Sequence, residues 1–283
     1  MSDRGRWRSP VTVDVSSYFD EGSDRFAGWT SALWDVHGAT LVAAAAPRPG
    51  ERVLDACCGG GSSALPAARA VGPSGRVHGV DLAGGLLATA RARATDAGLG
   101  NVEFASADVA GWPQGDYDAV LCGFGVFFLP DMDAGTDHLV GLLRDGGRFA
   151  MTCWPTGSLE AVFGPFFAAV GRHRPDLLDV PTPQFAANSE RLQTEQALRA
   201  WLTARGLGGL RIRRSELDIP IDADRGWDFL HSGPVRSVLG GVEQDVVDEI
   251  RRSFHDMIIA EGITTLQAPC LVATGTLDRA PER

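Results

Sequence analysis

The sequence contains no lysine, so all 26 of its permanently cationic side chains are arginine. Without lysine the chain can use neither Schiff-base catalysis nor a P-loop, whose lysine reaches the nucleotide phosphates. Long apolar runs are missing too, and no segment is predicted to span a bilayer. The polar N-terminus lacks the apolar stretch of a secretory signal. We therefore expect a cytoplasmic protein.

Charge and sulfur content exclude further classes of partner. The formal net charge of −10 weighs against nucleic acid, because phosphate binding draws on clustered cations. The five cysteines are odd in number, which indicates reduced thiols in a chain without a secretory signal. Neither the adjacent pair Cys57–Cys58 nor the six histidines show metal-ligand spacing. We expect no metal, no nucleic acid and no membrane partner.

Strand-like and helix-like segments alternate from about residue 50 to residue 155, which is typical of a parallel sheet covered on both faces. The sequence predicts an α/β, Rossmann-like fold, in which a seven-stranded, mostly parallel sheet carries helices on both faces and a helical cap. The predicted units are an N-terminal helical lid (1–48), a ligand-binding core (49–155), a helical cap insertion with a core helix (156–209), a core strand (210–221), a second cap insertion (222–268) and a final core strand with a tail (269–283).

The stretch "ERVLDACCGGGSSALPAARA" (51–70) predicts a strand, a turn of three glycines and a helix. Such a turn forms a binding crevice at the carboxyl edge of a parallel sheet, where glycines let a ligand approach the backbone. Asp81 ends the next strand, and its carboxylate can accept hydrogen bonds from both hydroxyls of a ribose. Asp108 follows the third strand, where a carboxylate can accept a hydrogen bond from the exocyclic amine of adenine. Together these features predict a nucleoside site.

In this order the motifs resemble those of class I S-adenosylmethionine-dependent methyltransferases. "VLDACCGGG" is similar to the first motif of that family, "GVDL" to its second-strand acid and "ADV" to its adenine-side acid, while "DYDAVLCGFGVFF" and "LLRDGGRFAMTCW" resemble its fourth and fifth strands. The resemblance implies S-adenosyl-L-methionine as cofactor and S-adenosyl-L-homocysteine as product. The cofactor-binding residues that it implies are Tyr18, Asp55, Ala56, Cys57, Gly59, Gly61, Asp81, Leu82, Asp108, Val109, Cys122, Gly123 and Phe124.

One departure and one alternative accompany this resemblance. Cys57 stands where the family usually has glycine, so the loop is expected to have a φ angle there that is compatible with a side chain. A dinucleotide-binding fold is the minority interpretation, because a G-x-G-x-x-G pattern counted from Gly59 ends at Ala64, where alanine is tolerated. The acid at position 108 favours the methyl donor.

The segment after the fourth strand, "CGFG" (122–125), lacks the amide or carboxylate with which relatives clamp a planar base amine. Aromatic segments such as "GWDFLHSG", similar to ones in UbiE-like and natural-product enzymes, favour a small-molecule acceptor, with a specialised metabolite expected. If the acceptor is a hydroxyl or a carbon acid, a base must remove its proton, and the candidates are His231 and His37. Tyr18 is expected to help close a lid over the cofactor.

Two other functions remain open from the sequence. In one, the bound sulfonium acts as a fixed charge for cyclisation or isomerisation without methyl transfer. In the other, the protein is a non-catalytic partner that retains the fold and binds the same cofactor. The oligomeric state is undetermined, with a homodimer as one option.

Overall fold

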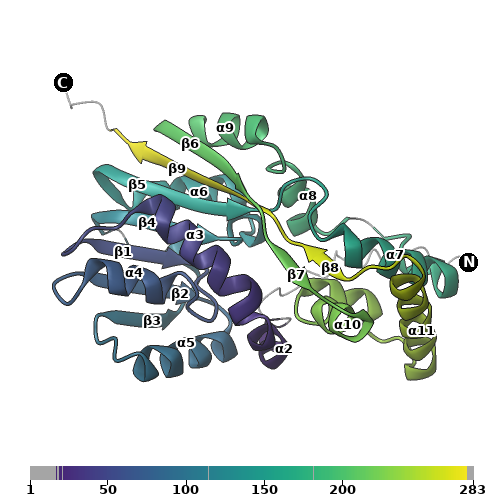
Figure 1. Cartoon of the computed structure of the whole chain (residues 1–283). Coiled ribbons are helices and arrows are strands. Elements are labelled where there is room, and N and C mark those ends of the chain that lie inside the picture. The colour runs from purple at the N-terminus through teal and green to yellow at the C-terminus, as the bar shows by residue number, and fades with distance from the viewer. Residues whose placement is uncertain (1–16, 18, 21, 114, 181, 279–283) are drawn as a thin grey trace, which may run out of the picture.

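The computed structural model describes residues 17, 19–20, 22–113, 115–180 and 182–278. They form a central sheet, helices on both of its faces and a cap beyond one end (Figure 1). The first five strands in spatial order are parallel, and β9 is antiparallel to both of its neighbours. This confirms the predicted fold class. The order across the sheet is β3 (Val102–Ser106), β2 (Arg76–Asp81), β1 (Arg52–Ala56), β4 (Tyr117–Gly123), β5 (Leu143–Cys153), β9 (Cys270–Leu277) and β6 (Leu207–Ser215).

Each face of the sheet has its own apolar core, because successive side chains of a strand point to opposite faces. Val53 packs with α3 (Asp35–Ala45) and α4 (Ala64–Val71), whereas its neighbour Leu54 belongs to the cluster that includes side chains of α6 (Met132–Gly141) and α9 (Glu195–Thr203). Strands buried on both faces read as continuous apolar runs, which explains the short apolar segments in the sequence. The remaining sheet helix, α5 (Gly84–Asp96), packs against β3.

The N-terminal segment, expected as one helix over residues 16–46, changes its winding on the way to the sheet. It runs through α2 (Ser23–Gly28), a π-helical turn η1 (Thr30–Trp34) and α3. The wider turn lets Trp29 and Leu33 enter the apolar core of the cap, while α3 continues onto the sheet. This segment therefore connects the cap and the sheet.

The cap is built around a third apolar core, which contains Phe166, Trp227 and Phe254. Its helices are α7 (Glu160–His173), α8 (Gln184–Glu190), α10 (Ala223–Leu230) and α11 (Gln244–Ala260), and its strands β7 (Asp218–Pro220) and β8 (Thr265–Gln267) form a small antiparallel sheet. Short 3-10 turns connect the elements: η2 (Val109–Gly111), η3 (Val126–Phe128), η4 (Pro175–Leu177) and η5 (Pro234–Leu239). Among the described residues, none of the helices combines the length and the apolar character needed to cross a membrane.

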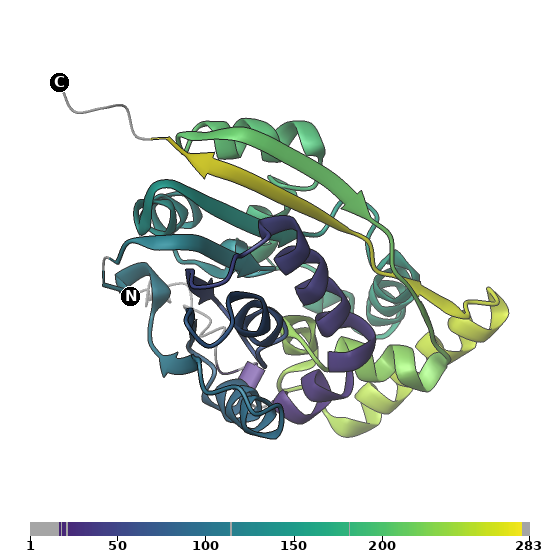
Figure 2. The same cartoon turned by 60° about the vertical axis from the view of Figure 1, so that its left-hand side comes forward.

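The structure divides the segment 210–221, which the sequence suggested as a single core strand. β6 stays in the main sheet until Ser215, and β7 then pairs with β8 in the cap. Ile219 and Leu266, buried at 3% and 0% exposure, anchor this second pairing in the core of the cap. β6–β7 and β8–β9 thus run together from the main sheet into the cap (Figures 1 and 2).

Candidate functional site

The turn between β1 and α4 contains three residues in the left-handed region of φ. They are Cys57 at +55°, Gly59 at +50° and Gly61 at +82°. The expectation for Cys57 was wrong, because the backbone keeps the conformation that favours glycine although the side chain is cysteine. A non-glycine residue in this region costs about 1–3 kcal/mol and persists only where its surroundings enforce it. The strand-to-helix geometry of the turn thus prevails over the local preference of the cysteine.

Two aspartates hold the turn in place. Asp55 is fully buried beneath it, and its Oδ2 accepts a hydrogen bond of 2.7 Å from the Ser63 hydroxyl. Burial raises the pKa of Asp55 to about 7. Asp81, at the end of β2, accepts hydrogen bonds of 2.8 Å from the backbone N–H groups of Gly59 and Ala83, one on each oxygen. Burial raises the pKa of Asp81 as well, against the opposing effect of those N–H groups.

An outer contact fixes the other side of the turn. Arg93 of α5 donates a hydrogen bond of 2.8 Å to the Gly60 carbonyl and two to the Asp35 carboxylate, of 2.7 and 2.8 Å. One terminal nitrogen of the guanidinium serves the carboxylate and the other serves the Gly60 carbonyl, so Arg93 joins Asp35 to the turn. The turn is therefore held between α3, α5 and the tip of β2.

Asp108 lies just beyond β3 and caps the short turn η2. Its Oδ1 accepts a hydrogen bond of 2.9 Å from the Ala110 N–H, and the carboxylate is exposed. Because an ionised carboxylate has about four acceptor positions, Oδ2 stays available for a donor from a ligand. Val109, the next residue, is buried and packs in the core of the sheet.

One large cavity, of about 1130 Å³, opens along the carboxyl edge of the sheet beneath the cap. Asp81 and Asp108 both line it, together with the turn, so the two acids face the same space. Most of the residues expected at the cofactor line this cavity: Cys57, Gly59, Asp81, Leu82, Asp108, Val109, Gly123 and Phe124. Asp55, Ala56, Gly61 and Cys122 are not among its lining residues, and Tyr18 lies outside the described residues.

Residues 53–147 match the family model described as "Methyltransferase domain". The chain is 37% identical over 146 residues to aklanonic acid methyltransferase DauC of Streptomyces sp. (strain C5), covering 51% of this chain and 66% of that enzyme. It is 35% identical over 147 residues to nocamycin O-methyltransferase of Saccharothrix syringae, covering 50% of this chain and 52% of the relative. Residues 53–147 therefore form a methyltransferase domain, as the motifs of the turn, Asp81 and Asp108 had indicated.

Solved structures show that the methyltransferase fold extends beyond that domain. A putative methyltransferase of Bacillus halodurans aligns with a TM-score of 0.57 at 17% identity, over 86% of this chain and 99% of the other. Phosphoethanolamine N-methyltransferase 2 of Haemonchus contortus, solved with S-adenosyl-L-methionine, aligns with a TM-score of 0.57 at 15% identity, over 95% of this chain and 61% of the other. At these identities the likeness concerns the fold. The chain spans only about half to two thirds of the length of these curated relatives.

The residues of this methyltransferase domain fit the cofactor of its family. The Asp81 carboxylate keeps acceptor capacity on both oxygens after the two backbone hydrogen bonds, and the turn beside it carries no bulky side chain that faces the cavity. Asp108 lines the same space and offers an acceptor that a donor such as an adenine amine could use. These groups suit an adenosyl moiety with its ribose against β2.

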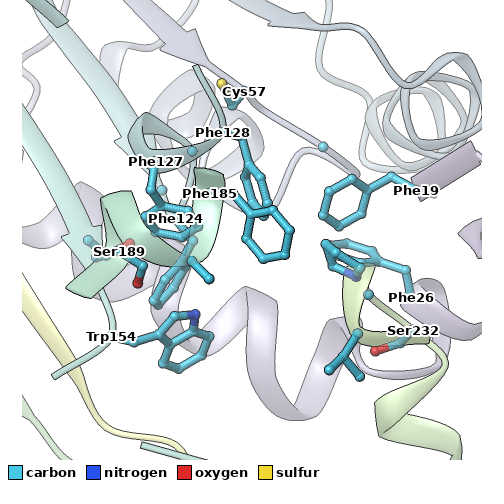
Figure 3. A pocket seen from close by; sticks show the side chains of 18 of the residues that line it. Phe19, Phe26, Cys57, Phe124, Phe127, Phe128, Trp154, Phe185, Ser189 and Ser232 are labelled. Atoms are coloured by element: carbon cyan, nitrogen blue, oxygen red, sulfur yellow. The ribbon is translucent and has the colours of Figure 1, made fainter. Parts of the chain in front are cut away.

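The rest of the cavity wall is strongly aromatic (Figure 3). Phe124 and Trp154 stack with ring centroids 4.2 Å apart and an angle of 27° between their planes. Phe26 stacks on Trp34 at 4.7 Å. Figure 3 shows Cys57 at one end of the cavity and Trp154 and Ser232 toward the other. The aromatic side chains in the lining are Phe19, Phe26, Trp34, Phe124, Phe127, Phe128, Trp154, Phe163, Phe167, Phe185 and Phe229.

Sequence reasoning found some of this wall and missed the rest. Trp154 and Phe185 lie outside the aromatic segments that the sequence had singled out. Trp154 directly follows β5, and a residue just past the carboxyl end of a parallel strand meets the ligand edge of the sheet, so its position was an available signal. Phe185 belongs to α8 of the cap, and its ring centroid lies 5.4 Å from that of Phe128. No sequence pattern near Phe185 predicts this contact, because the two residues are far apart in the chain.

The two histidines expected as bases occupy different places. His37 of α3 lines the cavity and is only 2% exposed, and it lies edge-on beside the stacked rings of Phe124 and Trp154 at centroid distances of 5.2 and 5.7 Å. Burial lowers the pKa of His37 to about 4, against a smaller opposing effect of the Ala268 backbone. His231 is not a lining residue, and its Nδ1 lies 2.9 Å from the Trp227 carbonyl.

Three side chains at the aromatic end of the cavity have buried polar atoms without a hydrogen-bond partner among the described residues, although the Trp34 ring itself is only partly buried. They are Trp34 through Nε1, Thr152 through Oγ1 and His37 through its ring nitrogens, near which the Ala268 backbone lies without the geometry of a full hydrogen bond. An unsatisfied buried polar atom costs about 1–3 kcal/mol. All three side chains line the cavity, and we refer to them below as the polar cluster.

Proposed function

We propose that this protein transfers a methyl group from S-adenosylmethionine to an oxygen, nitrogen or carbon atom of a small-molecule acceptor, and that the acceptor is a specialised metabolite. The observation that carries the proposal is the single cavity in which the Asp81 and Asp108 carboxylates share space with an aromatic chamber under the cap. The two named relatives act, by their names, on aklanonic acid and in the nocamycin series, which supports an acceptor of this kind.

The side chains divide the work of positioning between the two ends of the cavity. Asp81 would accept hydrogen bonds from the ribose hydroxyls, and Asp108 one from the adenine amine. When bound, S-adenosylmethionine supplies an electrophilic methyl group, which leaves sulfur as the acceptor atom bonds to it, so that S-adenosylhomocysteine remains. The aromatic wall excludes water and holds the acceptor in line, and such positioning lowers much of the barrier.

His37 is the better placed of the two candidate bases, because it lines the cavity and its pKa of about 4 keeps the imidazole neutral near pH 7. A neutral imidazole can accept a hydrogen bond from an acceptor hydroxyl and orient it. The low pKa makes His37 a weak base, so we assign it to orienting the hydroxyl by accepting its hydrogen bond, and the proton would leave to solvent after methyl transfer.

The test is calorimetric titration of cofactor-free protein with S-adenosylmethionine and S-adenosylhomocysteine, followed by product analysis with an acceptor. Binding of both, and release of S-adenosylhomocysteine in step with acceptor consumption, support the proposal. Conversion of the acceptor without that release would favour a reaction in which the sulfonium acts only as a charge. Absence of binding would overturn the cofactor assignment. The cytoplasmic location expected from the sequence stays a prediction.

A further inference from the structure

The polar cluster lies at one place in the cavity, around the ends of β4 and β5. Trp34 and His37 are three residues apart on the continuous helical segment formed by η1 and α3, and so lie on the same side of it. Thr152 pairs with Gly123 across the two strands, and its Oγ1 lies 3.7 Å from where a side chain on Gly123 would begin. Phe124 connects them, because it contacts both rings and donates its backbone N–H to the Thr152 carbonyl at 3.1 Å.

Nothing in the described part of the chain supplies a partner for these atoms, and a ligand could do so. Thr152 is 0% exposed, and its hydroxyl has no hydrogen-bond partner among the described residues. An apolar core of this shape would be more stable with valine at position 152, since valine has the same shape without the unpaired hydroxyl. A ligand that brings a hydrogen-bonding group to this point supplies what the protein leaves unpaired.

Access to the polar cluster restricts the shape of that ligand. The Phe124 and Trp154 rings stack on each other and both pack edge-on against His37. A flat aromatic molecule can slide between or beside such rings and replace one stacking contact with another. A bulky saturated molecule has no equivalent position. Phe124 also has a φ angle of +52°, and such strain in a non-glycine residue is concentrated at ligand-binding sites.

The charges of the lining restrict the ligand further. The lining, as far as the structure describes it, contains no arginine, and its formally charged side chains are the carboxylates of Asp81, Asp108, Glu160 and Glu190. An acceptor that enters as an anion would find no counter-charge in this wall and would lose its hydration. An uncharged acceptor avoids that cost.

We infer that the acceptor is an uncharged, planar, fused-ring aromatic molecule that inserts a hydroxyl group into the polar cluster formed by Trp34, His37 and Thr152. This inference rests on the proposed function and adds the chemical class of its substrate. The Trp34 indole N–H would donate to the hydroxyl oxygen, the His37 imidazole would accept its proton in a hydrogen bond, and Thr152 can serve in either sense. The fused rings would stack in the aromatic chamber beside Phe124 and Trp154.

Four small probes test the inference on the full chain saturated with S-adenosylhomocysteine. They are 2-naphthol, 2-methylnaphthalene without the hydroxyl, decahydro-2-naphthol without the aromatic rings, and the anion 2-naphthoate. Calorimetric or fluorescence titration should show that 2-naphthol binds at least fivefold tighter than each of the other three. Equal binding of decahydro-2-naphthol, or a preference for 2-naphthoate, would overturn the inference.

A pair of variants tests whether Thr152 binds the hydroxyl group of 2-naphthol. Thr152→Val should weaken 2-naphthol binding about fivefold while leaving 2-methylnaphthalene binding unchanged, and Thr152→Ser should restore the preference for the hydroxyl. The affinity for S-adenosylhomocysteine shows that each variant is folded, because that ligand is expected to contact the other end of the cavity. If S-adenosylhomocysteine does not bind the unaltered protein, the proposed function fails. If it binds and the naphthols are not distinguished, only the acceptor class is wrong.

Discussion

The Asp81 carboxylate accepts a hydrogen bond of 2.8 Å from the backbone N–H of Gly59, and so connects the tip of β2 to the turn after β1. The same carboxylate faces the cavity, where a ribose would bind. Asp81 therefore shapes the turn and recognises the ligand with one group. A change at this residue should affect both functions.

Replacing Asp81 with asparagine is expected to weaken binding of S-adenosylhomocysteine at least tenfold. The amide loses the charge, and hydrogen bonds to charged groups contribute about 1.5–3 kcal/mol. Calorimetry on the variant measures the loss. Asp96→Asn serves as the control, because Asp96 is an exposed residue at the end of α5 and not part of the cavity. Equal affinities of the two variants would contradict the assignment of Asp81.

Replacing Cys57 with glycine should stabilise the fold. The φ angle of +55° is strained for cysteine and free of strain for glycine, so the expected gain is about 1 kcal/mol. Thermal or urea unfolding measures it. The matched control is Cys58→Gly, since Cys58 is 5% exposed and has no positive φ, and its replacement should destabilise the protein. A loss of stability in Cys57→Gly as large as that in the control would show that packing of the thiol matters more than strain.

Gly125 should not tolerate a side chain. A Cβ atom there would lie 2.5 Å from the Cys57 Cβ and 2.8 Å from the Cys122 Sγ, well inside van der Waals contact. We expect Gly125→Ala to lower the free energy of unfolding by about 1–3 kcal/mol through overpacking. A Cβ atom on Gly100 would meet nothing within 4 Å, so Gly100→Ala should have nearly the same urea midpoint as the unaltered protein. A wild-type midpoint for Gly125→Ala would refute the crowding described.

The stability contributed by His37 should depend on pH. The pKa of His37 is about 4 in the folded protein, against 6.5 for an ordinary histidine such as that of the unfolded chain. Between these pH values the unfolded chain therefore binds more protons than the folded protein. Its contribution is complete above pH 6.5 and declines as the pH falls toward 4, by at most roughly 3 kcal/mol. The difference in free energy of unfolding between the wild type and His37→Phe should shrink correspondingly over this range. A constant difference would mean that the imidazole is not buried as described.

The stability contributed by Asp55 should depend on pH in the direction opposite to that of His37. Its pKa is about 7 in the folded state against 3.8 ordinarily, so the folded protein binds more protons between those values. Its contribution is complete below pH 3.8 and is lost as the pH rises through 7. Asp55→Asn imitates the protonated acid and keeps an acceptor for Ser63, so its stability relative to the wild type should rise by about 1 kcal/mol or more from pH 4 to pH 8. Urea titrations at several pH values measure the trend, and a fall in the relative stability of the variant would contradict it.

The first half of the fold could be predicted from the sequence because its strands are buried on both faces and appear as apolar runs between turns. The second half was harder, because β6 and β7 are adjacent in sequence yet pair in different sheets, and no local pattern marks Glu216 and Leu217 as the point of change. β8 has only three residues, too few for a periodicity. The positions of Asp81 and Asp108 at the cavity followed from strand ends. The choice between His37 and His231 did not, because only the packing of α3 against the sheet brings one of them to the cavity.

Ser215 and Cys270 are register partners at the ends of β6 and β9, so the chain leaves the main sheet and returns to it at neighbouring positions. Everything between them, residues 216–269, is an excursion whose two ends are already joined at the base. Because α11 of this segment packs against α7 and both contribute to the core of the cap, the segment is fixed at its base by the sheet and at its far side by α7. A change in its helices would therefore reshape the cavity from above while the strands that present Asp81 and Asp108 stay in place.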